Sequence, residues 1–448
     1  MKVYLLGIGG ISMSGIAYLL YNNGYEVCGS DVKQTKITDN LEKLGIKINY
    51  QQISKNITSD IDLVVYTAAI SNDNEELNEA KKLGIKLIDR ASIMGDIIKE
   101  YSNSISISGS HGKTTTTSLV SSIFLNLENK PTILVGGILP LIGSNVYLGG
   151  KDYFISEACE YKNSFLSFNS KHAIVLNIDS DHLDFFKDLD EIRKSFKLFI
   201  DKLTGILVIN ESIDNLDELI KDTKAKVVKF GYSEYADYRV GKIEYLNDRT
   251  KFEVIINNEI FEFTANVKGQ YNVENAVSAI AIAMELGVDL DSIENGLFNF
   301  ISPNRRFEYY GKIDRFEVYD DYAHHPTEIT AVLNNLDNIN KNNLCVFCPH
   351  TYSRTKDLFE EFAMSLSKAN KVIISPIFAA REKFDPTITE QMLVDKINDF
   401  GGNALYVGDY EKIAEYILKN SNEDLIATIG AGDVNEVINI LKNKVNML

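Results

Sequence analysis

The sequence lacks any apolar run that approaches the roughly 20 residues needed to cross a membrane, which excludes helical membrane spans. It has only seven prolines, no low-complexity tract and no fixed-period repeat, so fibrous and long disordered architectures are excluded as well. Its four cysteines include one CxxC-like pair with no partner pair, which indicates a reducing cytosol. The start MKVYLLGIGG is too short and too glycine-rich for a signal peptide. We therefore expect a cytoplasmic protein.

What is present is a chain of 448 residues with 46 basic and 63 acidic side chains and a formal net charge of −17. This length predicts two to four domains, each able to bury its own core. A composition of 45% hydrophobic and 24% charged residues is typical of a soluble globular protein. The acidic balance argues against a nucleic-acid partner, although a local basic pocket can still hold a nucleotide.

Short β-branched runs alternate with amphipathic helical stretches from the first residue onward, which predicts an α/β fold with doubly wound parallel sheets. We predict three domains: 1–100, Rossmann-like; 101–305, a P-loop domain with added antiparallel strands; and 306–448, again Rossmann-like. In the second domain, runs at 227–232, 251–256 and 260–265 alternate in a way typical of antiparallel strands. The boundaries rest on these changes of pattern.

The strongest motif is SGSHGKTTTTSLVSSIF, residues 108–124, in which a strand leads through a glycine turn into a helix. Backbone N–H groups in such a turn form a cradle for a polyphosphate. The spacing departs from GxxxxGK[ST], because Ile107 stands at the first glycine position. A glycine turn that merely caps a buried helix is the alternative. The predicted ATP-binding residues here are Gly109, Ser110, His111, Gly112, Lys113, Thr114 and Thr115.

A second glycine turn, GIGGISMSG, resembles the dinucleotide fingerprint but has Ser12 where the third glycine is expected. Asp31 follows at the end of the second predicted strand, where an acid usually contacts a ribose. The motif is a weak sign of NAD binding, and a purely structural turn is the alternative. The separate P-loop favours a nucleotide-linked substrate in the first domain and ATP in the second.

Acids and a histidine follow two further strands, with Glu157 and Glu160 after the first and Asp179, Asp181 and His182 after the second. The carboxyl ends of parallel strands gather at one edge, so we expect these groups to face the P-loop. Together with Thr114 they could hold Mg²⁺, although an imidazole is an unusual ligand for that ion. Acids that simply cap helices are the alternative.

Three loops of the last domain carry histidines and arginines, in DDYAHHPTEI, CPHTYSRT and FAAREKFD. Their cationic side chains suit a small anionic substrate such as a carboxylate. The histidine pair before Pro326 also suits a plain helix start. Zinc is disfavoured, because no Cys/His/Asp set has suitable spacing.

These motifs, together with GQYNVENAVSAIA and NRRFE, resemble in order the Mur ligases of peptidoglycan synthesis, and HGKTTT combined with DDYAHHPTEI is the most specific part. The resemblance implies a UDP-binding domain, a central ATPase and a C-terminal domain that carries the amino acid. It also implies ligation of L-alanine to UDP-N-acetylmuramate through an acyl phosphate, with ATP and Mg²⁺. A murein-peptide recycling ligase of the same fold is the alternative; oligomeric state is not predicted.

The resemblance further implies roles for individual residues. Lys113, Glu157, His182, Arg306 and Asp321 would be catalytic, with Thr114, Glu157 and His182 as metal ligands. Asn272, Asn275 and Arg306 would contact ATP. The UDP-sugar would be bound by Gly7, Gly9, Gly10, Ser12, Met13 and Asp31, and the alanine and muramoyl side by His325, His350, Arg354 and Arg381. Many members of the family have the sequence EADES where this chain has EACEY. Lys197 is predicted to be a surface lysine without a catalytic role.

Overall fold

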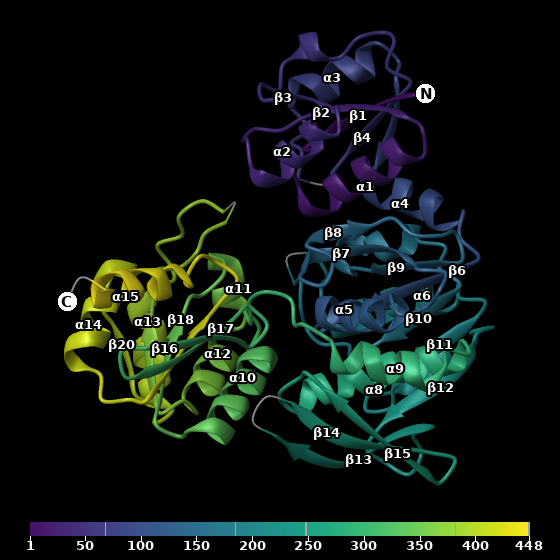
Figure 1. The fold of residues 1–448 in the computed structure, drawn as a ribbon. Helices are drawn as coiled ribbons and strands as arrows, with labels where there is room; N and C mark the ends of the chain where they lie inside the picture. Colours follow the sequence, from purple (N-terminus) through teal and green to yellow (C-terminus); the bar gives the residue numbers. More distant parts are fainter. Residues whose placement is uncertain (68, 184, 247–248, 381, 447–448) are drawn as a thin grey trace. The chain divides into compact units, whose positions relative to one another are not determined.

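The computed structural model describes residues 1–67, 69–183, 185–246, 249–380 and 382–446 (Figure 1). Its contacts form two compact units. The first unit comprises Met1–Asp179, Leu189–Asn266 and Val273–Pro303, and the second comprises Ser180–Asp188, Val267–Asn272 and Asn304–Leu448. The strands form three sheets, one within each of the three stretches predicted as domains.

The first sheet of the first unit is entirely parallel, in the order β3-β2-β1-β4-β5. Its strands are β1 (Lys2–Leu6), β2 (Glu26–Ser30), β3 (Lys47–Asn49), β4 (Leu63–Tyr66) and β5 (Lys86–Asp89). The helices that connect or follow them are α1 (Ile11–Asn22), α2 (Lys36–Lys43), α3 (Glu75–Lys82) and α4 (Arg90–Ile98). The strand order reverses at β1, so the glycine turn after β1 lies where such sheets bind ligands.

The second sheet has ten strands, in the order β15-β14-β13-β12-β11-β10-β6-β9-β7-β8. They are β6 (Asn103–Ser108), β7 (Thr132–Leu139), β8 (Ser144–Tyr147), β9 (Tyr153–Glu157), β10 (His172–Val175), β11 (Ile206–Asn210), β12 (Lys226–Gly231), β13 (Tyr238–Tyr245), β14 (Thr250–Ile256) and β15 (Glu259–Ala265). Pairing is parallel from β7 to β13, and β8, β14 and β15 add antiparallel edges. The order reverses at β6, which again places the P-loop at a switch point.

Five helices accompany this sheet: α5 (Lys113–Phe124), α6 (Leu189–Ile200), α7 (Leu216–Ile220), α8 (Gln270–Glu285) and α9 (Leu290–Phe298). Both α5 and α8 are buried along most of their length, which explains why apolar and small side chains predominate in them. Helices α5 and α9 approach closely at Gly296, where a Cβ atom would lie 2.4 Å from the Cα of Ile123.

The second unit contains a six-stranded sheet in the order β16-β17-β21-β18-β19-β20. Its strands are β16 (Glu308–Ile313), β17 (Phe316–Asp321), β18 (Asn343–Phe347), β19 (Lys371–Ile374), β20 (Ala404–Tyr406) and β21 (Leu425–Ile429). Its helices are α10 (Pro326–Ile339), α11 (Tyr352–Asp357), α12 (Phe359–Leu366), α13 (Glu390–Asp399), α14 (Tyr410–Asn420) and α15 (Glu436–Asn446). Successive residues of β18 join different core clusters, because α10, α12 and α13 cover one face and α14 and α15 the other.

The predicted α/β class and the added antiparallel strands are confirmed, with one correction. The run at 227–232 is not antiparallel: β12 pairs in parallel with both β11 and β13. Alternation of polar and apolar residues indicates that one face of a strand is buried. It does not indicate whether the strand runs parallel or antiparallel to its neighbours, because that depends on how the chain connects them. The 3₁₀ segments Ser54–Asn56 and Tyr161–Ser167 complete the regular structure.

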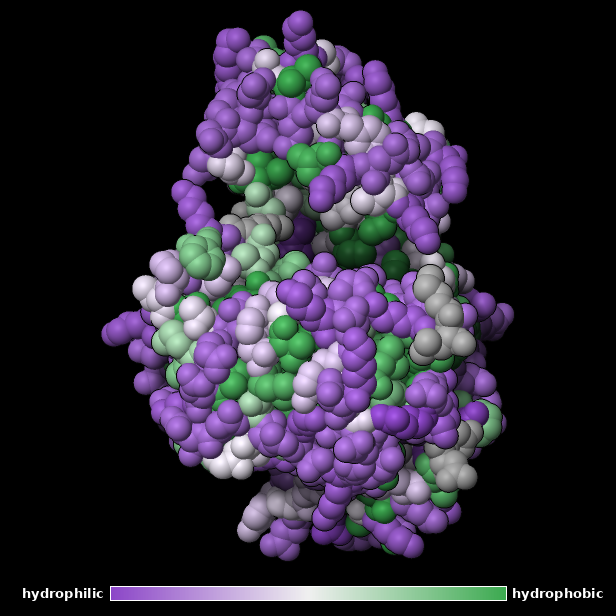
Figure 2. All heavy atoms as spheres, turned by 90° about the vertical axis from the view of Figure 1, so that its left-hand side faces the viewer, coloured by the Kyte–Doolittle hydropathy of each residue, from purple (hydrophilic) through white to green (hydrophobic). Residues whose placement is uncertain are grey.

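The surface agrees with the composition. Figure 2 shows a face on which hydrophilic residues predominate and hydrophobic residues form small, scattered groups. Among the residues that the structure describes, no helix combines the length and the apolar character needed to cross a membrane.

Candidate active site

The P-loop of the first unit joins the end of β6 to the start of α5 through two glycines with positive φ, Gly109 at 144° and Gly112 at 83°. Gly112 is the N-cap of α5, and a Cβ atom there would lie 3.0 Å from Oδ1 of Asn275. A side chain would therefore strain the backbone and crowd a neighbour. The turn stays narrow and exposes backbone N–H groups at a helix N-terminus, which is the arrangement that binds phosphate.

Lys113, the first residue of α5, folds back over this turn. Its Nζ atom donates to the carbonyl oxygens of Gly109 and Ser110 and lies 3.0 Å from Oε2 of Glu160. The Glu160 side chain is 2% exposed, so the structure holds a buried ion pair beside the phosphate cradle. The ammonium group is thus kept at the turn by three acceptors.

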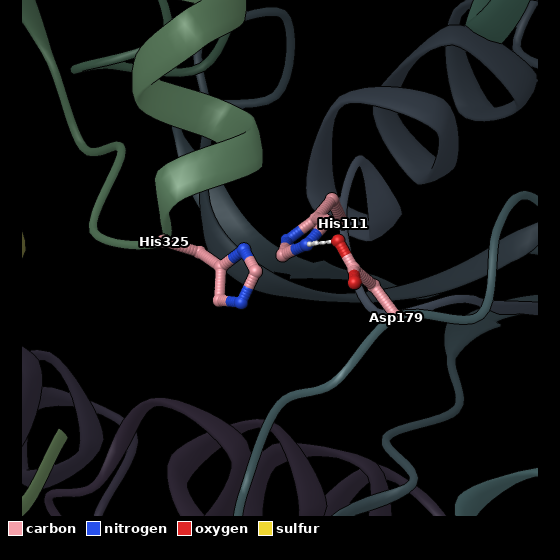
Figure 3. Close-up of side chains that lie close together, drawn as sticks. All are labelled: His111, Asp179 and His325. Carbon is pink, nitrogen blue, oxygen red and sulfur yellow. Dashed lines mark hydrogen bonds and ion pairs between the residues drawn. The ribbon is translucent and has the colours of Figure 1, made fainter. Parts of the chain in front are cut away.

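The strand-end segment after β10 is fastened to the P-loop. Asn177 accepts the backbone N–H of His111 at 2.8 Å through Oδ1 and donates to the His111 carbonyl oxygen at 3.2 Å. Ser110 Oγ accepts the backbone N–H of Asp179 at 2.8 Å. Figure 3 shows the imidazole of His111 beside the Asp179 carboxylate, 3.3 Å apart. Asn177 is not among the predicted site residues, although it follows a strand as they do.

Glu157 and Thr114 lie against two adjacent glycines of β7, Gly136 and Gly137 respectively. The backbone N–H of Gly136 donates to Oε1 of Glu157 at 2.8 Å, and a Cβ atom on Gly137 would lie 3.6 Å from Cγ2 of Thr114. The structure thus brings together these two predicted metal ligands. A hydroxyl and a carboxylate at the start of a phosphate-binding helix are oxygen donors of the kind that Mg²⁺ prefers.

The predicted asparagines begin α8. Asn275 is buried and borders the P-loop at Gly112. Asn272 belongs to the second unit and donates to the carbonyl oxygen of Lys268 at 2.9 Å. Of the predicted P-loop residues, Ser110 and Thr115 are also buried.

The N-terminal glycine turn is built by backbone contacts between two strand ends. The N–H groups of Gly7 and Ile8 both donate to the carbonyl oxygen of Ser30, and Gly7 has φ of 76°. Asp31 accepts the N–H of Gly9 at 2.8 Å, so its carboxylate shapes the turn directly. Gly10 is the N-cap of α1 and has no side chain to cap the helix.

Two predicted members of this turn have different surroundings. Met13 is buried in the core, with 2% exposure. Ser12 accepts a hydrogen bond of 3.1 Å from Arg90 at the start of α4. Sequence reasoning missed Arg90, although its position directly after β5 follows the rule that identified the other site residues.

In the second unit, Asp321 ends β17 and accepts the backbone N–H groups of Phe307 and Ala323, each at 2.7 Å. Burial raises the pKa of Asp321 to about 7, although the positive charge of Arg306 opposes the rise. Arg306 lies over the ring of Tyr322, 5.3 Å from its centroid. The structure therefore places the predicted Arg306 and Asp321 near one another.

A second group in this unit surrounds Asp181. Arg354 donates to its carboxylate at 2.7 Å, and His182 lies 3.7 Å from it. Burial alone would raise the pKa of Asp181, but the neighbouring His182 and Arg354 hold it well below its usual range. Nδ1 of His350 lies 3.4 Å from Nη1 of Arg354, and burial lowers the pKa of His350.

The adjacent histidines serve different local purposes. His325 caps α10 and faces the carbonyl oxygen of Ser180 at 3.0 Å. His324 lies near Glu328, at 3.6 Å, and burial lowers the pKa of His324 to about 4. Both the helix-start reading and a role in ligand binding are compatible with these contacts. The predicted Arg381 lies outside the described residues.

Comparison with known proteins covers nearly the whole chain. Residues 2–102 match the model "Mur ligase family, catalytic domain", 107–283 the "Mur ligase middle domain" and 305–432 the "Mur ligase, glutamate ligase domain". The chain is 48% identical to the UDP-N-acetylmuramate–L-alanine ligase of Lachnospira eligens, over 97% of this chain and 96% of that protein. It is 45% identical to the ligase of the same name from Clostridium kluyveri, over 99% and 98%.

A solved structure agrees with these matches. The UDP-N-acetylmuramate–alanine ligase of Thermotoga maritima is 27% identical, covers 100% of both chains and superposes with a TM-score of 0.82. With the family models and these relatives in agreement along its length, the chain belongs to the Mur ligase family.

Proposed function

We propose that this enzyme joins L-alanine to the carboxylate of UDP-N-acetylmuramate, with ATP as the energy source, in the synthesis of peptidoglycan precursors. The observation that carries the proposal is the 48% identity, over 97% of the chain, to a ligase of that name. The P-loop at the switch point of the central sheet supports the use of ATP, because its turn and helix form a phosphate cradle.

The chemistry proceeds in two steps. A carboxylate oxygen of the muramoyl group attacks the γ-phosphorus of ATP, the bond to the bridging oxygen breaks, and ADP leaves. The amino nitrogen of alanine then attacks the acyl phosphate, the C–N bond forms, and phosphate leaves while the nitrogen loses its proton. The activation is needed because a carboxylate is a poor electrophile until it carries a good leaving group.

Within this scheme Lys113 neutralises charge on the transferring phosphoryl group, and the P-loop N–H groups orient the ATP. The contacts of Lys113 with the turn support this role, because they already hold its ammonium group at the cradle. Thr114 and Glu157 would hold Mg²⁺, which would screen the phosphate charges when bound. His182 is the third proposed ligand, and Arg306, Asp321 and Asn272 would act from the second unit.

The remaining assignments complete the proposal. The turn of Gly7, Gly9 and Gly10 would bind the UDP group, and the loops of His325, His350 and Arg354 would position alanine and the muramoyl carboxylate. We also propose a cytoplasmic location and a division of labour among the ranges 1–100, 101–305 and 306–448. All four cysteines are free thiols, which supports a reducing compartment.

Purified enzyme incubated with UDP-N-acetylmuramate, ATP and an equimolar mixture of L-alanine and a murein tripeptide tests the substrate. Mass spectrometry should find the alanine adduct, together with ADP and phosphate in equal amounts. A product formed with the tripeptide alone would replace this proposal with the recycling reaction.

A further inference from the structure

Arg90 is a cation beside the glycine turn that follows β1 in the first unit. It is the first residue of α4, directly after β5, and it is partly buried. Its NH1 atom donates to Oγ of Ser12 at 3.1 Å. Within the described part of the chain, no carboxylate forms an ion pair with its guanidinium group, since the adjacent Asp89 is used otherwise.

The carboxylate of Asp89 caps α4 and accepts hydrogen bonds from the first turn of that helix. Its Oδ1 atom accepts the N–H groups of Ala91 and Ser92 at 2.9 and 3.1 Å, and its Oδ2 atom accepts the Ser92 hydroxyl at 2.6 Å. The neighbouring carboxylate thus stabilises the helix, and the guanidinium group keeps its charge and most of its five donors for another acceptor.

The hydrogen bond to Ser12 locates the guanidinium group of Arg90. Ser12 is in the first turn of α1, whose N-cap is Gly10 and whose first turn contains no acidic residue. The backbone N–H groups of this turn and the guanidinium group therefore approach the same place from two elements. A doubly charged, oxygen-rich group is the chemical match for both sets of donors.

The charge of Arg90 also acts on the loop after β9. Burial raises the pKa of the Cys159 thiol, and the positive charges of Lys113 and Arg90 both oppose that rise. Within the first unit, Asn145 of β8 donates to the carbonyl oxygen of Ile11 at 2.6 Å, which fastens the start of α1 to the second sheet.

We propose that Arg90 binds the diphosphate of the UDP-linked substrate, together with the backbone N–H groups of the first turn of α1. This inference rests on the proposed function. It assigns the diphosphate a side-chain ligand from α4, where the glycine turn alone supplies only backbone donors. The planar guanidinium group of an arginine suits this role better than the ammonium group of a lysine, because it can donate to two phosphate oxygens at once.

The test measures dissociation constants by calorimetry for UDP, UDP-N-acetylglucosamine, UDP-N-acetylmuramate and ATP. For Arg90→Gln we expect all three uridine ligands to bind about 10-fold to 100-fold more weakly, as for the loss of a charged hydrogen bond, with ATP unchanged. Arg90→Lys should recover part of the loss. Arg193→Gln is the matched control, since Arg193 belongs to the same unit and pairs with Asp214 at 3.2 Å.

The ligand series separates the outcomes. Weaker binding of UDP-N-acetylmuramate alone would overturn the proposal, because Arg90 would then contact the carboxylate. Equal affinities for the native enzyme and Arg90→Gln would overturn it as well, and would leave the proposed function intact. Failure of the native enzyme to bind any uridine ligand would overturn the proposed function itself. Circular dichroism of each variant verifies that it is folded.

Discussion

The Nζ atom of Lys113 lies 3.0 Å from Oε2 of Glu160, whose side chain is 2% exposed. A buried carboxylate without its partner is costly, so Lys113 contributes to stability as well as to the proposed chemistry. These two contributions can be separated by experiment, because neutralising Glu160 removes the stability cost of losing Lys113 and does not replace the ammonium group in the reaction.

For Lys113→Ala we expect ligation to fall by about 10³-fold and the free energy of unfolding to drop by about 3 kcal/mol. Adding Glu160→Gln removes the unpaired charge and should restore most of the stability without restoring activity. Steady-state kinetics and urea unfolding provide the two readouts. Lys151→Ala, which removes an exposed lysine paired with Glu100, is the control. Full activity in Lys113→Ala would show that the phosphate site is elsewhere.

The shape of the P-loop predicts a specific effect of Gly112→Ala. The positive φ and the contact with Asn275 both oppose a side chain there, so ATP affinity should fall at least about tenfold. Gly287→Ala is matched, because Gly287 has φ of 78° and open space around its Cα. It should lose about 1 kcal/mol of stability and keep its ATP affinity. Equal ATP binding by both variants would refute the proposed crowding at Asn275.

The buried carboxylate of Glu76, in α3, contacts strands of the first sheet and predicts an effect on stability away from the P-loop. Glu76 is fully buried and accepts hydrogen bonds from Tyr4 at 2.8 Å, Ser30 at 2.5 Å and Asn56 at 2.6 Å. Glu76→Ala leaves these donors unsatisfied and should cost about 3 kcal/mol, measured by urea unfolding.

Because the Ser30 carbonyl oxygen holds the glycine turn, affinity for UDP should fall in Glu76→Ala too. The control is Glu75→Ala, at the neighbouring exposed position. A Glu76→Ala protein as stable as this control would show that the three hydrogen bonds contribute little.

The raised pKa of Asp321 predicts how stability depends on pH. Burial raises this pKa to about 7, whereas in the unfolded chain it is near 3.8. Between these values the folded state binds a proton that the unfolded state does not, so the free energy of unfolding falls as pH rises from about 4 to 7. Asp321→Asn should remove on the order of 1 kcal/mol of this dependence.

Urea unfolding at pH 5 and pH 8 measures this effect. The free energy of unfolding of Asp321→Asn, relative to that of the native protein, should be higher at pH 8 than at pH 5. Asp314→Asn, at an exposed position, should match the native protein at both pH values. An identical pH dependence in Asp321→Asn and the native protein would exclude a protonated Asp321.

Much of this fold could be predicted because buried parallel strands are short, β-branched and bounded by glycine turns. The short β-branched runs KVYLL at 2–6, SISIS at 104–108 and LIATIG at 425–430 are of this kind, and they form β1, β6 and β21 within one residue of those limits. The run at 206–210 was missed although it forms a central strand, β11. The hairpin of β7 and β8 was missed as well, because its glycines resemble a loop in the sequence.

The candidate site was partly predictable for a related reason. Residues at strand ends or in the turns that follow them, such as Asp321 and Lys113, are visible in the sequence, since parallel sheets gather ligands at strand ends. Glu76 was missed because its importance comes from a partner 46 positions away, Ser30, whereas Arg90 was missed although it directly follows β5 and only its partner, Ser12, is distant in the sequence. No local pattern distinguishes a helix glutamate that faces solvent from one that faces a buried hydroxyl.

The most direct test of the central claim uses UDP-N-acetylmuramate labelled with ¹⁸O in its muramoyl carboxylate. With ATP and L-alanine, the account predicts the alanine amide and inorganic phosphate that carries one ¹⁸O atom per turnover, because the oxygen that attacks ATP leaves with the phosphate. Unlabelled phosphate would contradict the acyl-phosphate route, and the absence of the alanine amide would contradict the proposed function.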